Sequence, residues 1–354
     1  MRAAQYYGKK DVRVEEIDDP PVGEGEVEIS IAYAGICGTD RHEYVAGPIL
    51  IPDAEPHPAT GERLPVTLGH EVSGTVEAVG EGVTAVEPGD RVTVNPMLPC
   101  GECQYCLAGK HNVCVDLGFV GLSGGGGGFA ERLVVDEDNA VPIPDDVSLK
   151  EASLVEPFSV GLHAVRHSPV RTGDSVAVFG TGPIGLTVIQ AARAAGARRI
   201  LVSEPQAGRR EIAEEIGADV TLDPTEVDPV EEIRERTEDG VEVAFEVAGV
   251  DASFSQALRS TQHDGHLRVV SVYEDDVTFN PNEVVTVERT ISGTNVYTGG
   301  PRSGEEYGMT LSMIESGAFD PSALITDLVD LDDVVAGFES LLSDDGQVKI
   351  LVEP

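Results

Sequence analysis

The second half of the chain alternates between short apolar runs and segments with helical periodicity. Helical patterns separate the apolar runs, and they fall at 186–196, 208–217, 230–237 and 251–260. The apolar runs have the length of strands and fall at 175–180, 198–204, 218–223, 241–249, 265–272 and 290–296. Strands that alternate with helices at this spacing are typical of α/β proteins. The pattern therefore predicts a doubly wound, parallel, six-stranded sheet.

The first 150 residues follow a different pattern. Strict alternation at 25–33 and 75–79 predicts half-buried strands, and the five glycines at 124–128 indicate a turn. Helical periodicity is scarce there and returns only near the end of the chain, at 310–317 and 334–342. We expect a β-rich domain that the C-terminal stretch returns to complete.

These two patterns predict two domains. The chain has 354 residues, 41 % of them hydrophobic, which is enough material for two cores. The expected β-rich domain comprises residues 1–158 and 297–354, and the expected parallel-sheet domain comprises residues 159–296.

The charge of the chain is strongly negative. Asp and Glu number 63 against 24 Lys and Arg, which gives a net charge of −39. Nucleic acids and anionic membranes require basic surfaces, so neither is an expected partner. No apolar run reaches the roughly 20 residues of a membrane helix and no secretory signal is evident, which favours a cytoplasmic protein. Because salt screens self-repulsion, the charge predicts a salt-rich cytosol; an ordinary acidic protein is the alternative.

Four of the five cysteines lie within one short segment. Cys100, Cys103, Cys106 and Cys114 have the spacing C-x2-C-x2-C-x7-C. Four thiolates this close fit one tetrahedral zinc ion better than two strained disulfides, which are rare in the cytoplasm. We expect a structural zinc in a lobe spanning residues 97–116, with four merely buried cysteines as the alternative.

The fifth cysteine and one histidine are candidate ligands of a second metal ion. Cys37 follows the strand pattern at 25–33, and His70 precedes the one at 75–79. A thiolate and an imidazole are ligands that select zinc over magnesium or calcium. On spacing alone, the alternative that both residues serve packing stays open.

A glycine-rich turn links the first predicted strand of the parallel sheet to its helix. Gly180, Gly182 and Gly185 form G-x-G-x-x-G, with Pro183 and Ile184 inside the motif. Glu204 ends the next strand, twenty-four residues after the first glycine. In this setting the motif predicts a dinucleotide site, in which the helix N-terminus holds the pyrophosphate and the carboxylate binds a ribose diol.

The acid at the end of that second strand favours NAD over NADP. A 2′-phosphate beside Glu204 would suffer like-charge repulsion. Arg209 and Arg210 follow closely, and either could bind that phosphate by folding back, so NADP remains the alternative.

Taken together, these segments resemble the zinc-dependent medium-chain alcohol dehydrogenases over essentially the whole chain. The resemblance rests on GHEVSGTVEAVGEGV (69–83), PGDRV (88–92), the four-cysteine lobe and GTGPIG (180–185). It implies a GroES-like, β-rich catalytic domain and a Rossmann NAD-binding domain. The segment LVEPFSVGLHAV (154–165) resembles the polyol and diol branch, and the segment 46–65 resembles its butanediol group.

The resemblance implies roles for six residues. Cys37, His70 and Glu156 become ligands of a catalytic zinc, and Glu71 becomes a carboxylate that coordinates intermittently or lies beside the ligands. Thr39 and His42 become the start and end of a proton relay. For Glu71 the alternative is a surface acid, and for His42 a solvent-exposed structural histidine.

The resemblance also implies a reaction. With two zinc ions per chain and NAD, the protein would transfer hydride from a secondary alcohol or a vicinal diol such as 2,3-butanediol, through an alkoxide on zinc, and give the ketone. Sorbitol, xylitol, sugar and threonine dehydrogenases are the rivals, and a non-enzymatic structural or regulatory relative is a further one. The strand at 290–296 lies where family members pair their sheets, so a homodimer or homotetramer is expected.

Overall fold

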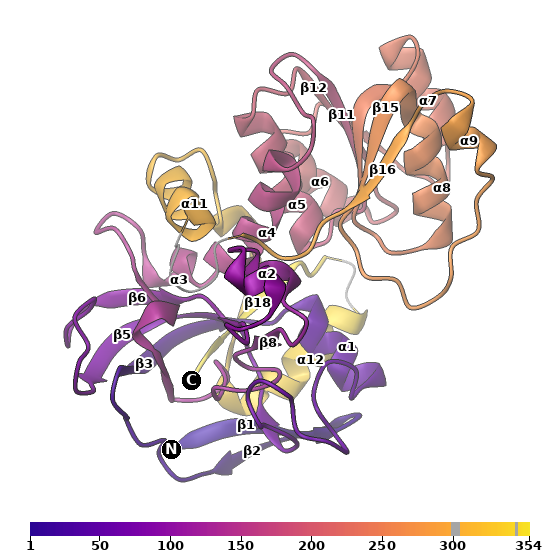
Figure 1. Cartoon of the computed structure of the whole chain (residues 1–354). Coiled ribbons are helices and arrows are strands. Elements are labelled where there is room, and N and C mark those ends of the chain that lie inside the picture. The colour runs from indigo at the N-terminus through magenta and orange to yellow at the C-terminus, as the bar shows by residue number, and fades with distance from the viewer. Residues whose placement is uncertain (299–304, 344–345) are drawn as a thin grey trace. The chain divides into compact units, whose positions relative to one another are not determined.

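The computed structural model describes residues 1–298, 305–343 and 346–354 (Figure 1). The chain forms two compact units. The first comprises Met1–Glu156, Thr298–Ser316 and Ile325–Pro354, and the second comprises Pro157–Tyr297 and Gly317–Leu324. The expected division, after residue 158 and before residue 297, remains a prediction about domains. The segment Gly317–Leu324, which was expected in the first domain, belongs to the second unit.

Three sheets build the first unit. The largest has the order β10-β6-β5-β3-β18-β17, with β9 also paired to β3. Its strands are β3 (Glu26–Gly35), β5 (Glu71–Val79), β6 (Arg91–Val94), β9 (Arg132–Asp136), β10 (Ala140–Pro142), β17 (Ile325–Asp330) and β18 (Lys349–Glu353). The other two sheets contain β1 (Arg2–Gly8), β2 (Asp11–Glu16) and β4 (Val66–Thr67), and β7 (Met97–Leu98) and β8 (Gly118–Phe119). Since β18 pairs with β3, the last residues of the chain complete the first sheet.

Among the residues that the structure describes, the first unit has few helices. They are α1 (Gly38–Ala46), α2 (Gln104–Leu107), α3 (Leu149–Ala152), α11 (Glu305–Glu315) and α12 (Val334–Ser343), with 3₁₀ turns η1 (His111–Val113), η2 (Glu137–Asn139) and η4 (Leu331–Asp333). Phe338 of α12 stacks on Tyr44 of α1 with ring centroids 5.2 Å apart. Both rings belong to the core formed by the sheet, so the C-terminal helix helps to fix α1.

The second unit contains the predicted parallel sheet. Its order is β13-β12-β11-β14-β15-β16. The strands are β11 (Ser175–Phe179), β12 (Arg199–Ser203), β13 (Val220–Leu222), β14 (Val241–Glu246), β15 (Thr261–Val269) and β16 (Thr290–Gly293). The helices are α5 (Pro183–Ala194), α6 (Ala207–Glu215), α7 (Pro229–Thr237), α8 (Asp251–Ser260) and α9 (Asn282–Val285), with the 3₁₀ turn η3 (Ser322–Leu324); α4 (Val155–Arg166) begins at the end of the first unit.

The strand order reverses at β11, which lies between β12 and β14. In sheets of this kind, ligands bind outside the carboxyl ends of the strands at such a switch point. The glycine-rich turn directly follows β11. The fold therefore places the predicted dinucleotide motif where a ligand is expected, and the six-stranded prediction is confirmed.

Within the residues that the structure describes, no helix combines the length and apolar character needed to cross a membrane.

Candidate active site

A thiol, an imidazole and a carboxylate meet in the first unit. Cys37 directly precedes α1, whereas His70 directly precedes β5 and Glu71 is the first residue of that strand, which is paired with the end of β3. One ligand atom from each of these three residues lies within 4.8 Å of the others. His70 and Glu71 are buried and Cys37 is half-buried. The structure thus brings together three of the residues that the sequence marked as metal ligands or their neighbours.

Asp40 lies between Cys37 and His70 and contacts both. One carboxylate oxygen, Oδ2, accepts a hydrogen bond of 2.9 Å from the Cys37 backbone N–H, as a helix-capping residue does. The other, Oδ1, lies 3.4 Å from Nδ1 of His70. Burial lowers the pKa of His70, but Asp40 and Cys37 raise it more, so the pKa lies well above its ordinary value. Asp40 thereby orients the imidazole.

A buried lysine neutralises Glu71. The ammonium of Lys349, on β18, lies 2.6 Å and 2.8 Å from the two oxygens of the Glu71 carboxylate and donates to the carbonyl of Ile36 at 3.0 Å. Burial lowers the pKa of Lys349, but Glu71 and Cys37 raise it more, so the net shift is upward. A side chain at Gly35 would overlap the Glu71 carboxylate, because a Cβ there would lie 2.0 Å from Oε2.

Glu156 is buried in the first turn of α4 but lies outside the group formed by Cys37, His70 and Glu71. Burial raises its pKa to about 7, although His70 and Lys349 oppose the rise. Its carboxyl group therefore lies within electrostatic reach of the cluster and lacks the close counter-ion that Glu71 has. A cation nearby would favour its ionised form.

The two predicted relay residues lie on α1. The hydroxyl of Thr39 lies 3.8 Å from Sγ of Cys37. His42 follows three residues later, half-buried, with Nε2 3.5 Å from a guanidinium nitrogen of Arg41. Residues three apart on a helix share a face, so a path from Thr39 to His42 runs along one side of α1.

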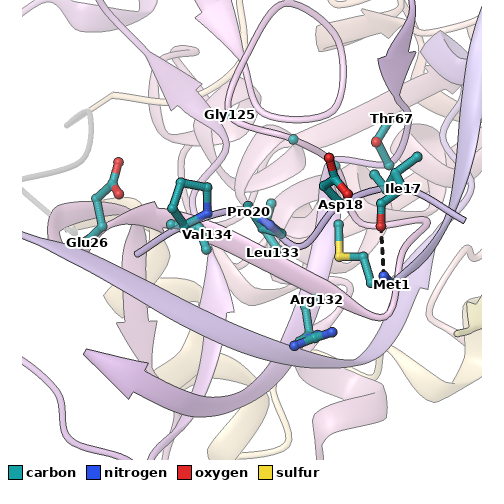
Figure 2. A pocket seen from close by; sticks show the side chains of 13 residues that line it. Met1, Ile17, Asp18, Pro20, Glu26, Thr67, Gly125, Arg132, Leu133 and Val134 are labelled. Carbon is teal, nitrogen blue, oxygen red and sulfur yellow. Dashed lines mark hydrogen bonds between the residues drawn. The ribbon is translucent and has the colours of Figure 1, made fainter. Parts of the chain in front are cut away.

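A surface hollow of the first unit lies at a different place. It has a volume of about 270 Å³ and includes the N-terminal ammonium, which donates to the carbonyl of Ile17, and the side chain of Arg132 (Figure 2). None of the predicted catalytic residues lines it. The predicted chemistry of the first unit therefore lies in its ionisable cluster and not in this hollow.

The four cysteines form a second group. Cys100, Cys103, Cys106 and Cys114 each place a sulfur atom within 4.8 Å of the others. Tetrahedral zinc–thiolate geometry requires sulfur separations of about 3.8 Å, and Cys103 and Cys114 are 4.0 Å apart. Backbone N–H groups of Cys106 and Val115 lower the pKa of Cys103 to about 6, whereas burial raises that of Cys106 to about 12. These residues fit a structural zinc with four thiolate ligands.

A different geometric feature explains why each position of the dinucleotide motif is a glycine. Gly180 has a φ of +97° and lies against Ala248. A Cβ at Gly182 would meet nothing within 4 Å, so a ligand can approach the backbone at the start of α5. A Cβ at Gly185 would lie 2.0 Å from the carbonyl oxygen of Gly180. These are the tight turn, the open approach and the close packing that a dinucleotide-binding turn needs.

Glu204 is buried and points its carboxylate at this turn. Its Oε2 accepts hydrogen bonds from the backbone N–H (2.8 Å) and the hydroxyl (3.0 Å) of Thr181, and its Oε1 accepts from the N–H of Gln206 (3.0 Å). Arg210 is held by Asp223 at 3.0 Å and by the carbonyls of Glu204 and Pro205. Arg209 lies half-buried in the first turn of α6.

Two family models match the chain. An alcohol dehydrogenase GroES-like domain matches residues 23–145, and a zinc-binding dehydrogenase domain matches residues 183–316. The chain therefore belongs to the zinc-type, medium-chain alcohol dehydrogenase family. It is an enzyme of that family, an oxidoreductase that acts on small alcohols with zinc and NAD or NADP.

Among its relatives, the (R,R)-butanediol dehydrogenase of Bacillus subtilis is 45 % identical over the full length of both chains. A crystal structure of 2R,3R-butanediol dehydrogenase from the same organism superposes with a TM-score of 0.94, covering 100 % of this chain and 99 % of that one. A sorbitol dehydrogenase of B. subtilis is 34 % identical, over 100 % of this chain and 97 % of that one. A zinc-binding dehydrogenase from Sinorhizobium meliloti, bound to NADP, superposes with a TM-score of 0.90 at 31 % identity, covering 100 % and 99 % of the two chains.

Sequence reasoning missed two residues of the catalytic cluster. Asp40 stands three residues after Cys37, a spacing typical of helix capping, and that signal was readable. Lys349 lies 278 residues from Glu71 in the sequence, and nothing local marks it. Only the pairing of β18 with β3 brings this lysine to the site.

Proposed function

We propose that this enzyme uses NAD to oxidise a secondary alcohol or a vicinal diol to the ketone, and that 2,3-butanediol is its preferred substrate. The observation that carries the proposal is the buried cluster of Cys37, His70 and Glu71, with Glu156 beside it. The full-length similarity to butanediol dehydrogenases supports the choice of substrate.

The cluster fits a catalytic zinc ion. Its potential anions, Cys37, Asp40, Glu71 and Glu156, outnumber the single lysine that faces them, so a divalent cation would offset the excess charge. Cys37, His70 and Glu156 would hold the metal, and the Lys349 ion pair keeps Glu71 beside it as a carboxylate. When bound, zinc supplies a Lewis acid that lowers the pKa of an alcohol, and NAD accepts the hydride.

The chain's own residues then orient groups and move a proton. Asp40 holds the imidazole of His70 through Nδ1, which leaves Nε2 for the metal. The Thr39 hydroxyl would accept the proton of the alcohol while giving up its own proton toward His42, and His42 would release one proton to solvent. Burial removes His70, Glu71 and Glu156 from water, which strengthens the electrostatic interactions among them.

The geometry around Glu204 supports NAD in preference to NADP. A 2′-phosphate would meet a buried carboxylate, and Arg210 is already engaged by Asp223. We expect kcat/KM with NAD to exceed that with NADP by at least about tenfold. Equal kcat/KM values for NAD and NADP would indicate that Arg209 binds the 2′-phosphate of NADP.

The experiment that tests the proposal compares substrates in concentrated KCl by following NADH at its absorbance. The panel contains the separate 2,3-butanediol stereoisomers, sorbitol, xylitol, glucose and threonine. A preference for one butanediol stereoisomer is the expected result. Preference for a polyol, a sugar or threonine would retain the zinc and NAD chemistry but overturn the substrate, and no turnover of any compound would favour a non-enzymatic role.

We further propose a homodimer, or a homotetramer built from dimers. The strand β16 lies at the edge of the parallel sheet and offers its free side to a second copy. Light scattering coupled to size exclusion measures the mass directly. A monomer at micromolar concentration would contradict this assembly.

The net charge supports a protein adapted to a high-salt cytosol. At molar salt the Debye length falls to about 3 Å, which removes most of the repulsion between acidic side chains. We expect the melting temperature to fall steadily as KCl is dialysed from molar to millimolar concentration. An unchanged melting temperature would mark an ordinary acidic protein.

A further inference from the structure

A buried carboxylate that the proposed reaction does not use lies at the end of β14. Glu246 is fully buried, and its two oxygens accept hydrogen bonds from five donors. Oε1 accepts from the backbone N–H groups of Ala248 and Gly249, both at 2.9 Å, and from the hydroxyl of Ser253 at 2.6 Å. Oε2 accepts from the hydroxyl of Ser271 and, at 2.5 Å, from that of Tyr273.

None of these five donors carries a charge. A buried carboxylate without a cation is costly unless hydrogen bonds replace its hydration, and five donors occupy its accepting capacity. Bonds to an ionised acceptor are also stronger than bonds between neutral groups. Glu246 therefore joins two loops firmly, the one after β14 (247–250) and the one after β15 (270–273).

The first of these loops touches the dinucleotide turn, and the second loop touches the first. A Cβ on Gly180 would lie 2.9 Å from Cβ of Ala248, and a Cβ on Gly249 would lie 2.8 Å from the carbonyl oxygen of Val272. The turn after β11 therefore packs against loop 247–250, and loop 247–250 packs against loop 270–273. All three segments lie at the carboxyl ends of the adjacent strands β11, β14 and β15. This edge of a doubly wound sheet is where its ligand binds.

Glu246 itself is covered and cannot contact a ligand, whereas the loops that it joins are accessible. Val272, next to two of its partners, exposes 89 % of its surface, and Val250 exposes 53 %. Two exposed apolar side chains therefore stand on the loops that Glu246 joins.

We propose that Glu246 is a positioning residue for the dinucleotide. Its carboxylate holds loop 270–273 against loop 247–250, which in turn packs against the turn at Gly180. The binding surface thus has its shape before the cofactor arrives, and less ordering is needed on binding. This inference rests on the proposed use of NAD by the second unit.

The test compares Glu246→Gln with a matched control. The control is Glu242→Gln on the same strand, where the carboxylate accepts a 2.9 Å hydrogen bond from the backbone N–H of Ser175 at the opposite end of the sheet. We expect Glu246→Gln to raise the NADH dissociation constant, measured by fluorescence titration, and the KM for NAD about tenfold. kcat at saturating NAD should change less than about threefold, and Glu242→Gln should leave cofactor binding unchanged.

A second readout requires no cofactor. In the free protein, hydrogen exchange at 247–250 and 270–273 should accelerate in Glu246→Gln and stay at the wild-type rate in Glu242→Gln. Tyr273→Phe, which removes one of the five donors, should raise the NADH dissociation constant by about threefold.

The outcomes distinguish the positioning role of Glu246 from the proposed use of NAD. If the wild type binds NADH and Glu246→Gln binds it equally well, or if both Gln variants weaken binding alike, the positioning role is overturned while NAD use stands. If the wild type shows no NADH binding at all, the proposed cofactor and the positioning role both fail.

Discussion

The two predicted zinc sites of the first unit are built in opposite ways. The four thiols of the cysteine lobe come from fifteen consecutive residues, 100–114, and need only a short loop to meet. The predicted catalytic site draws on distant segments: Cys37 precedes α1, His70 and Glu71 lie where β5 begins, and Glu156 and Lys349 come from α4 and β18. A local site can form with its loop, whereas the dispersed site exists only after the sheet has paired.

The charge balance of the two sites differs as well. The lobe has sulfur ligands and backbone N–H donors, and its charge has to be balanced by the metal. The cluster already contains a buried ion pair, and it offsets part of its negative charge with Lys349. The lobe should therefore depend on zinc for its stability, and the cluster should depend on zinc for its chemistry.

The largest effect should follow from Cys37→Ser. Loss of the catalytic metal removes several kcal/mol of transition-state stabilisation, so kcat/KM should fall by at least about 1000-fold. Zinc measured by atomic emission should drop from two ions per chain to one, with little change in melting temperature. If Cys37→Ser kept both zinc ions, Cys37 would not be needed to hold the second ion, and the proposed distinction between a structural and a catalytic site would fail.

Next in size is the effect of Lys349→Met. Removing the ammonium leaves the buried Glu71 carboxylate without its partner, which typically costs about 3–5 kcal/mol of folding stability. Denaturant unfolding measures the loss. The double variant Lys349→Met with Glu71→Gln should recover most of it, and a double variant as unstable as the single one would show that the lysine acts through packing instead of charge.

Cys106→Ser should affect the lobe in the complementary manner. We expect one zinc ion to be lost and about 3 kcal/mol of stability with it, which lowers the melting temperature by roughly 6–12 °C. The remaining folded enzyme should keep a kcat near that of the wild type at low temperature. Because protons compete for thiolates, zinc should leave the lobe more readily as the pH falls. A drop in kcat as large as that of Cys37→Ser would contradict the structural role.

The smallest effect concerns the proposed proton path. Thr39→Val removes a hydroxyl 3.8 Å from the Cys37 sulfur and should lower kcat by about 100-fold, the lower bound for acid–base assistance. Thr39→Ser restores the hydroxyl and should restore most of the rate. If Ser and Val reduce kcat equally, Thr39 has a steric role only.

Local patterns were sufficient to predict much of this molecule. Alternating strands and helices predicted the six-stranded sheet, although β15 starts at Thr261, four residues earlier than its apolar run. The glycine spacing predicted the dinucleotide turn, in which the structure shows close packing at Gly180 and Gly185 and open space at Gly182. In each case the residues involved are neighbours along the chain, so the backbone geometry that they require produces a recognisable local sequence pattern.

The sequence by itself determined the alternating strands and helices of the second unit, the cysteine lobe and the dinucleotide turn, because each of these elements is encoded by residues close together along the chain. Tertiary structure alone decided that Lys349 neutralises Glu71, that Asp40 faces His70 and that Glu246 joins two loops at the edge of the sheet. Burial is the physical reason. A carboxylate becomes an ion-pair partner or a hydrogen-bond acceptor for loops only where folding has removed it from water, and strand pairing over hundreds of residues decides which donors meet it there.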